Sequence, residues 1–181
     1  MVTKPRAWGV KAPAAELGKD EKLKILILVK KGCEDLARAV RMELEQFGLE
    51  YGCMPLKAST GCGSAASMVR KCPENGYGAI IVLSGDSAHE AQMLSRASVV
   101  PMCLVLNTGG RSAKHWLRSM ADLIGVEVGS GIPVFLSGDP HDDLTAAGNA
   151  ALHAAKCLAL HDPKLRKRIY ALIVEGSPAS I

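Results

Sequence analysis

The stretch from Ala147 to Ile169 reads A-G-N-A-A-L-H-A-A-K-C-L-A-L-H-D-P-K-L-R-K-R-I. Its pattern predicts one long helix, from about Thr145 to Leu160, that contains mostly small residues. The helix should stop near His161-Asp162-Pro163, because a proline cannot continue it. The basic residues that follow, from Lys164 to Arg168, predict a second, shorter helix at the C-terminal end.

Alanines recur throughout the long predicted helix and leave it little bulk with which to cover a surface. Such a helix can approach its neighbour very closely, and two neighbours are open: the sheet of the same chain, or another subunit. The alanines concerned are Ala146, Ala147, Ala150, Ala151, Ala154 and Ala155.

Short apolar runs and amphipathic helices alternate through the rest of the chain. The first run, Lys24 to Val29, is continuously apolar after its lysine, as expected for a central parallel strand buried on both faces. Further strands are predicted at 50–56, 79–83, 102–106 and 132–136, and helices at 34–47, 63–71, 89–96 and 113–123. This alternation predicts an α/β fold, a three-layer flavodoxin-like sandwich with a central five-stranded parallel sheet and a C-terminal helical extension.

Length and composition limit the possible classes of protein. The chain has 181 residues, which fits one α/β domain over residues 23–181 after a polar, proline-broken arm at 1–22 that we expect to be mobile. No apolar run approaches the ~20 residues that span a bilayer. We therefore expect no membrane partner. The net charge is +4, but the basic residues form no stripe with interleaved aromatics, so we expect no nucleic-acid partner either. The basic helix near the C-terminus should present a solvated face.

The six cysteines lie at positions 33, 53, 62, 72, 103 and 157. They form no C-x-x-C pair and have no histidine at zinc-ligand spacing, so we expect no metal site and no cofactor. Cys53, Cys103 and Cys157 fall in predicted strands or in the apolar helix, where cysteine behaves as a small hydrophobe. A reduced, cytoplasmic setting fits this pattern best.

Four segments carry a resemblance to a known family. They are the C-terminal run quoted above, E-N-G-Y-G-A-I-I at Glu74–Ile81, S-G-D-S-A-H at Ser84–His89, and G-I-P-V at Gly131–Val134. Together they resemble the AIR carboxylase family, which includes the carboxyaminoimidazole ribonucleotide mutases of purine biosynthesis. The resemblance implies a homo-oligomer, a tetramer or an octamer, and a phosphoribosyl small molecule as ligand.

The loop after the first strand departs from the family pattern. The family has G-S-x-S-D there, and its serines and amides take up the ribonucleotide phosphate. This chain reads Val29-Lys30-Lys31-Gly32-Cys33-Glu34-Asp35, without either serine. Asp35 matches the family aspartate only if the register slips by two residues.

The loop after the second strand departs further. The family has S-A-H-R-T-P, in which the histidine is the general acid/base and the arginine grips the phosphate. Here Ser59 stands in the histidine position and Thr60 in the arginine position, and the first histidine of the chain is His89, which matches the family's loop histidine. A serine hydroxyl does not titrate near neutral pH, so the family mechanism cannot run as written.

Three loops at the carboxyl ends of the strands still suggest an anion site. Glycines, hydroxyls and free amides at helix starts favour phosphate, and lysines add charge. The alternative is ordinary turns that need glycine, with Asp86 only capping a helix. The candidate ligand-binding residues are Lys30, Lys31, Gly32, Thr60, Gly61, Gly63, Ser64, Ser84, Gly85 and Asp86, and the candidate catalytic residues are Ser59 and His89.

Three functions therefore stay open at the level of sequence. The first is a relative of the family with lost or altered catalysis that keeps a nucleotide-sized pocket. The second is an active carboxylase or mutase that uses His89. The third is a different small-molecule enzyme that uses Ser59 or Cys62, whose thiol lies between two glycines at a predicted helix start, a setting that can lower a thiol pKa.

Overall fold

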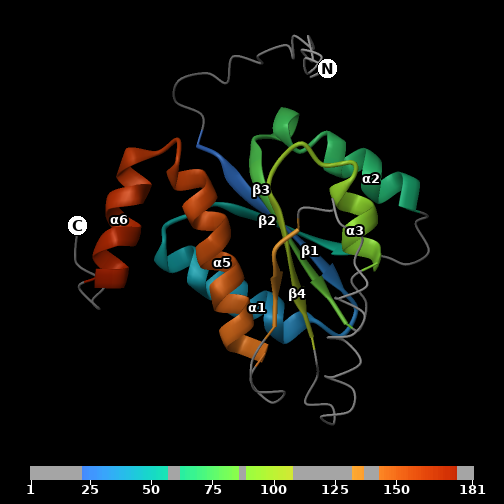
Figure 1. Cartoon of the computed structure of the whole chain (residues 1–181), viewed down its shortest axis with the longest axis horizontal. Helices are drawn as coiled ribbons and strands as arrows, with labels where there is room; N and C mark the ends of the chain where they lie inside the picture. The colour runs from blue at the N-terminus through green and yellow to red at the C-terminus, as the bar shows by residue number, and fades with distance from the viewer. Residues whose placement is uncertain (1–21, 57–61, 86–88, 108–131, 137–142, 175–181) are drawn as a thin grey trace, which may run out of the picture.

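A computed structural model describes residues 22–56, 62–85, 89–107, 132–136 and 143–174. The strands are β1 (Lys24–Lys30), β2 (Tyr51–Leu56), β3 (Tyr77–Ser84), β4 (Met102–Leu106) and β5 (Val134–Phe135). The helices are α1 (Glu34–Gln46), α2 (Cys62–Arg70), α3 (His89–Ser95), α5 (Asp143–Ala159) and α6 (Pro163–Val174), with a short 3-10 helix at Pro73–Asn75. Figure 1 shows the sheet between α5 on one side and α2 and α3 on the other, with α6 outside α5. None of the described helices has the length and apolar character that crossing a bilayer requires.

The sheet has the order β2-β1-β3-β4-β5, and each neighbouring pair of strands is parallel. From β1 the chain moves outward to β2, returns past β1 to β3, and then continues the other way to β4 and β5. The order therefore reverses between β1 and β3. In open α/β sheets, ligands bind outside the carboxyl ends of the strands at such a switch point.

The inner strand β1 has apolar side chains on both faces. Ile25 and Ile27 join the core that α1 and α5 cover, whereas Leu26 and Leu28 join the core under α2 and α3. All four side chains are completely buried. Burial on both faces explains why β1 reads as a continuous apolar run, and it confirms the predicted three-layer flavodoxin-like sandwich.

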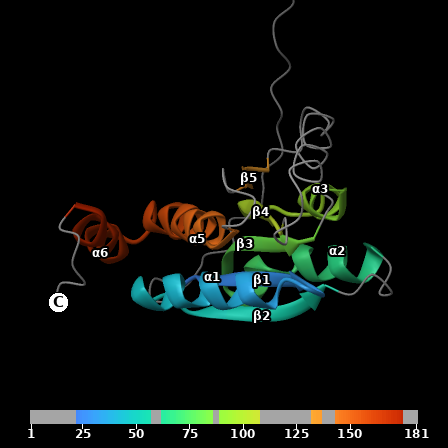
Figure 2. The ribbon, with the colours of Figure 1, turned by 90° about the horizontal axis from the view of Figure 1, so that it is seen from below.

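The alanines of α5 pack within the chain. The six alanines named above are at most 2% exposed, and α5 contacts α1, β3 and β4. Figure 2, seen from below, shows α5 beside the sheet and α6 farther out. Of the two neighbours that the sequence left open, the sheet and α1 of the same chain are thus the ones that α5 meets.

The terminal helix α6 begins as the sequence predicts. The Oδ1 atom of Asp162 accepts hydrogen bonds from the amides of Lys164 and Leu165, at 2.8 and 3.1 Å, and thereby caps the helix. Leu165 and Ile169 are buried, while the basic side chains between 164 and 168 are exposed. The predicted solvated basic face holds only in part, because the guanidinium groups of Arg166 and Arg168 donate to backbone carbonyls of neighbouring segments.

The predicted strands and helices agree with the described ones to within a few residues. Two strands differ most from their predictions: β3 is three residues longer than 79–83, and β5, at the sheet edge, is three residues shorter than 132–136 and pairs with β4 through two positions. The predicted helix at 113–123 and all but the last residue of the predicted N-terminal arm lie outside the described residues.

The expectation that Cys53 is a buried small hydrophobe is wrong. Cys53 is exposed, as are Met54 and Pro55 beside it on β2. The physical reason is position: β2 is an edge strand with one neighbour only, so its side chains receive less cover than those of β1. Cys103, on the inner strand β4, is buried as predicted, and Cys157 is partly buried.

Gly48 provides a test of how α6 docks on the end of α1. Its φ of +62° is left-handed, and an added Cβ would collide with the guanidinium of Arg168, which donates to the carbonyl of Phe47 at 2.6 Å. Gly48→Ala should therefore lower the free energy of unfolding by about 1–2 kcal/mol, as measured by urea denaturation.

Gly148→Ala is the matched control for this substitution. Its added Cβ would meet nothing nearer than 3.8 Å, and the residue lies inside α5. This variant should be as stable as the parent or more stable by about 0.5–1 kcal/mol. Equal stability of the two variants would contradict the described contact between α6 and Gly48.

Candidate functional site

The candidate site lies at the carboxyl edge of the sheet, where the order of the strands reverses. The loop after β1 and the segment after β3 meet there, and β4 ends beside them. The described residues of these segments are 30–34, 84–85, 89–90 and 107. Their contacts show which polar groups already have a partner in the chain.

An ion pair spans the switch point. The Nζ atom of Lys30, the last residue of β1, lies 3.1 Å from Oε2 of Glu90, the second residue of α3. The two side chains are 27% and 29% exposed, so the pair is less screened by water than a surface pair. The same Oε2 atom is buried and accepts no hydrogen bond within the described structure, so its described partner is the Lys30 charge.

The turn after β1 holds a carboxylate of its own. Gly32 has a φ of +89°, which favours glycine, and the amide of Cys33 donates to the carbonyl of Lys30 at 3.1 Å. The amide of Gly32 donates to Oε1 of Glu34 at 3.1 Å. This hydrogen bond, the Glu34 amide and the charge of Lys31 together lower the pKa of Glu34, so the carboxylate is ionised at neutral pH.

Asn107 connects this turn to the other strands. Its Nδ2 atom donates to the carbonyl of Gly32 at 2.7 Å, and its backbone amide donates to the carbonyl of Ser84 at 2.8 Å. One residue after β4 thus links the ends of β1 and β3. The turn is thereby tied to the sheet at a fixed place.

The structure brings together part of the predicted anion site. Lys30, Gly32 and the Ser84 backbone meet at the switch point, while Lys31 is exposed in the turn. The Ser84 side chain is completely buried, and an added Cβ at Gly85 would meet nothing within 4 Å.

The remaining candidates cannot be placed at the level of side chains. Ser59, Thr60, Gly61 and Asp86 lie outside the described residues. Cys62, Gly63 and Ser64 form the first turn of α2, and His89 is the first residue of α3, but only their backbone is described. Their predicted roles stay predictions.

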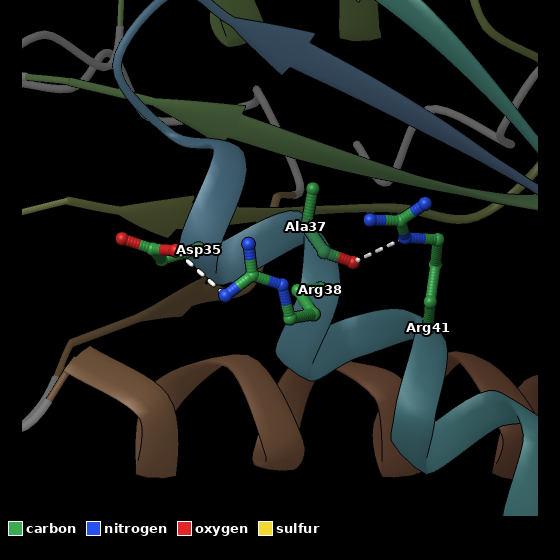
Figure 3. Close-up of polar contacts among 4 residues, drawn as sticks. All are labelled: Asp35, Ala37, Arg38 and Arg41. Atoms are coloured by element: carbon green, nitrogen blue, oxygen red, sulfur yellow. Dashed lines mark hydrogen bonds and ion pairs between the residues drawn. The ribbon is translucent and has the colours of Figure 1, made fainter.

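Asp35, the conditional match to the family aspartate, makes a local contact on α1. Its Oδ1 atom lies 3.2 Å from Nη1 of Arg38, and both side chains are exposed. Figure 3 shows the two side chains facing each other along the helix, with Arg41 donating separately to the carbonyl of Ala37 at 3.1 Å. Asp35 is therefore engaged one helical turn along, not with the turn after β1.

Sequence reasoning missed three residues of this edge, namely Glu34, Glu90 and Asn107. Asn107 could have been predicted, because a polar residue directly after a buried parallel strand falls at the edge where ligands bind. The indication for Glu90 was weaker: it is the residue next to the candidate His89. Glu34 reads as an ordinary acidic residue in the first turn of a helix, and its contact with Gly32 depends on the left-handed turn.

The described groups of the site are ammonium, carboxylate and amide groups. In the described part of the chain, no cluster of three or more histidine, cysteine, aspartate or glutamate residues is placed to hold a metal ion. The edge can therefore form ion pairs and hydrogen bonds with a polar ligand, and His89 opens the helix that carries Glu90.

A family model named AIR carboxylase matches residues 26–175, which includes every described strand except the start of β1. The chain belongs to the AIR carboxylase family. Its segments at 74–81, 84–89, 131–134 and 147–169, which carried the resemblance, all lie within the matched range.

Curated relatives agree with this assignment. The N5-carboxyaminoimidazole ribonucleotide mutases of Escherichia coli K12 and O157:H7 are each 35% identical to the chain over 104 residues. The match spans 57% of this chain and 57% of each relative, a little over half of their length.

Solved structures support the fold of this AIR carboxylase family member. Treponema denticola PurE superposes with a TM-score of 0.69 at 16% identity, over 84% of this chain and 91% of that one. A single-residue variant of Treponema denticola PurE2 gives a TM-score of 0.68 at 16% identity, over 85% and 92%. At this identity the similarity establishes the flavodoxin-like fold.

Thiol labelling tests the burial of the described cysteines in this family member. Burial raises the pKa of Cys103 to about 12, with a smaller contribution from Cys157, and burial also raises the pKa of Cys72. Among the described cysteines, exposed Cys53 should react first with iodoacetamide in the native protein, whereas Cys103 should react only after unfolding. Peptide mass spectrometry gives the rate at each site.

The same experiment examines Cys62 as a nucleophile. Labelling at Cys62 well above the rate at Cys53 would support a reactive thiol, and labelling at Cys62 no faster than at Cys53 would reject it. Labelling of native Cys103 as fast as Cys53 would contradict the described burial.

Proposed function

We propose that this AIR carboxylase family member is a PurE-like homologue of the purine-biosynthetic carboxylases and mutases, with lost or altered catalysis and a pocket for a phosphorylated nucleotide. One observation carries the proposal. The family model matches the chain from residue 26, yet no histidine precedes His89 and no arginine lies between Arg41 and Arg70. The loop after β2 therefore contains neither of the two residue types that the family chemistry needs there.

The missing histidine has a large energetic consequence. Moving a carboxylate between nitrogen and carbon of an aminoimidazole requires a proton to be delivered and removed near neutral pH. A general acid/base typically contributes about 10²–10⁴-fold in rate, or roughly 3–5 kcal/mol. Ser59 cannot supply this without a neighbouring base, and Thr60 carries no charge to hold a phosphate.

The carboxyl edge supports retained binding of a polar ligand. Lys30, the Gly32 amide and Asn107 lie at the switch point, where ligands of such sheets bind. A phosphoribosyl compound is the proposed ligand of this edge, where its phosphate would compete with Glu90 for Lys30. We further propose that the chain works in the cytoplasm as a homo-oligomer, a tetramer or an octamer, as its family membership favours.

An active carboxylase or mutase is the second candidate function. The 35% identity to the Escherichia coli mutases over 104 residues favours it. In that case His89, at the start of α3, would be the proton carrier.

Turnover separates the two candidates. The purified full-length chain, incubated with carboxyaminoimidazole ribonucleotide and followed spectrophotometrically, should give no rate above the uncatalysed background, because the imidazole of the second loop is absent. The Escherichia coli mutase, assayed in parallel, is the positive control. Robust turnover that His89→Asn abolishes would overturn the proposal and establish the active enzyme.

A further inference from the structure

Each positive group that the structure describes at the switch point already faces a carboxylate of the chain. Lys30 pairs with Glu90 at 3.1 Å, and the amide of Gly32 donates to Glu34 at 3.1 Å. The second lysine of the turn, Lys31, is close enough to Glu34 to help lower its pKa. These groups come from both sides of the strand reversal, since Glu90 follows β3, Lys30 ends β1 and the others follow β1.

The turn is also held in the geometry that makes these contacts. Asn107 donates to the carbonyl of Gly32 at 2.7 Å, which fixes the peptide whose neighbouring amide points to Glu34. The Lys30–Glu90 pair is about one-quarter exposed on each side, and Glu90 Oε2 is buried. A carboxylate in this position repels a dianion and competes for the same cation.

We propose that Glu34 and Glu90 keep this edge self-occupied, so that a phosphorylated ligand must displace two carboxylates of the chain before it reaches Lys30 and the Gly32 amide. The two residues are thus specificity-determining, because they weaken the binding of doubly charged anions. A phosphorylated ligand binds only if its other contacts with the protein compensate for this loss of affinity. This inference rests on the proposed function in placing the ligand at the carboxyl edge.

Phosphate titration of variants in which Glu34 and Glu90 are replaced by uncharged residues tests the inference. Inorganic phosphate is the probe, the full-length chain is isotope-labelled, and the amide resonance of Gly32 reports binding at the turn. Glu34→Ala removes the acceptor of the Gly32 amide hydrogen bond. Glu90→Gln removes the negative charge that pairs with Lys30 and preserves the shape of the side chain. The double variant should bind phosphate at least about tenfold more tightly than the parent, with the Gly32 resonance shifting.

Asp35→Asn is the matched control. It also removes one negative charge next to Glu34 in the sequence, but the Asp35 side chain pairs with Arg38 and not with a group of the switch point. It should bind phosphate within about twofold of the parent, as expected for an exposed charge screened by salt. Glu34→Gln separates occupancy from charge, since glutamine can still accept the Gly32 hydrogen bond. It should tighten binding less than Glu34→Ala does.

The outcomes distinguish this inference from the proposed function. A double variant that binds phosphate no more tightly than the parent, or a gain that Asp35→Asn reproduces, overturns the inference even if the parent binds aminoimidazole ribonucleotide. Tighter phosphate binding with a Gly32 shift supports the inference even if the parent binds no nucleotide, a result that would count against the proposed pocket alone. Unchanged circular dichroism spectra confirm that each variant is folded.

Discussion

The close approach of α5 to the sheet and to α1 is the constraint on which the rest of the structure depends. The alanines on α5 between 146 and 155 are at most 2% exposed, so single methyl groups separate this helix from its neighbours. Larger side chains in such a contact would strain the core by about 1–3 kcal/mol. Because α5 packs against α1, β3 and β4 together, it fixes α1 relative to β3, one of the two strands between which the sheet order reverses.

The position of α1 in turn fixes the turn that precedes it. Cys33, directly before α1, is buried in the core that α5 closes, and Asn107 holds Gly32 from the end of β4. The Lys30–Glu90 pair then crosses the switch point. The scaffold of the AIR carboxylase family is present, but the charges that the structure describes at the carboxyl edge of the sheet are matched by the chain's own carboxylates. Family membership therefore predicts the fold, while the chemistry proposed for this edge depends on residues of this chain.

Much of the fold could be predicted because its signals are local. The continuous apolar run of β1 and the Asp162-Pro163 step between α5 and α6 are each determined by a few neighbouring residues. The contacts of Glu90 and Asn107 could not, because they depend on which loops meet across a sheet whose spatial order differs from its sequence order. Cys53 was misjudged for the same reason, since an edge strand and an inner strand read alike. The predicted roles of Ser59 and Thr60 rest on sequence alone.

A double-mutant cycle on Lys30 and Glu90 tests most directly whether the positive charge at the carboxyl edge is paired with a carboxylate of the chain itself. Lys30→Met, Glu90→Gln and the double variant, compared with the parent by urea denaturation, give the coupling free energy of the pair. A half-buried pair at 3.1 Å predicts a favourable coupling of about 1–2 kcal/mol. A coupling below roughly 0.3 kcal/mol, as for many solvent-exposed pairs, would contradict the account.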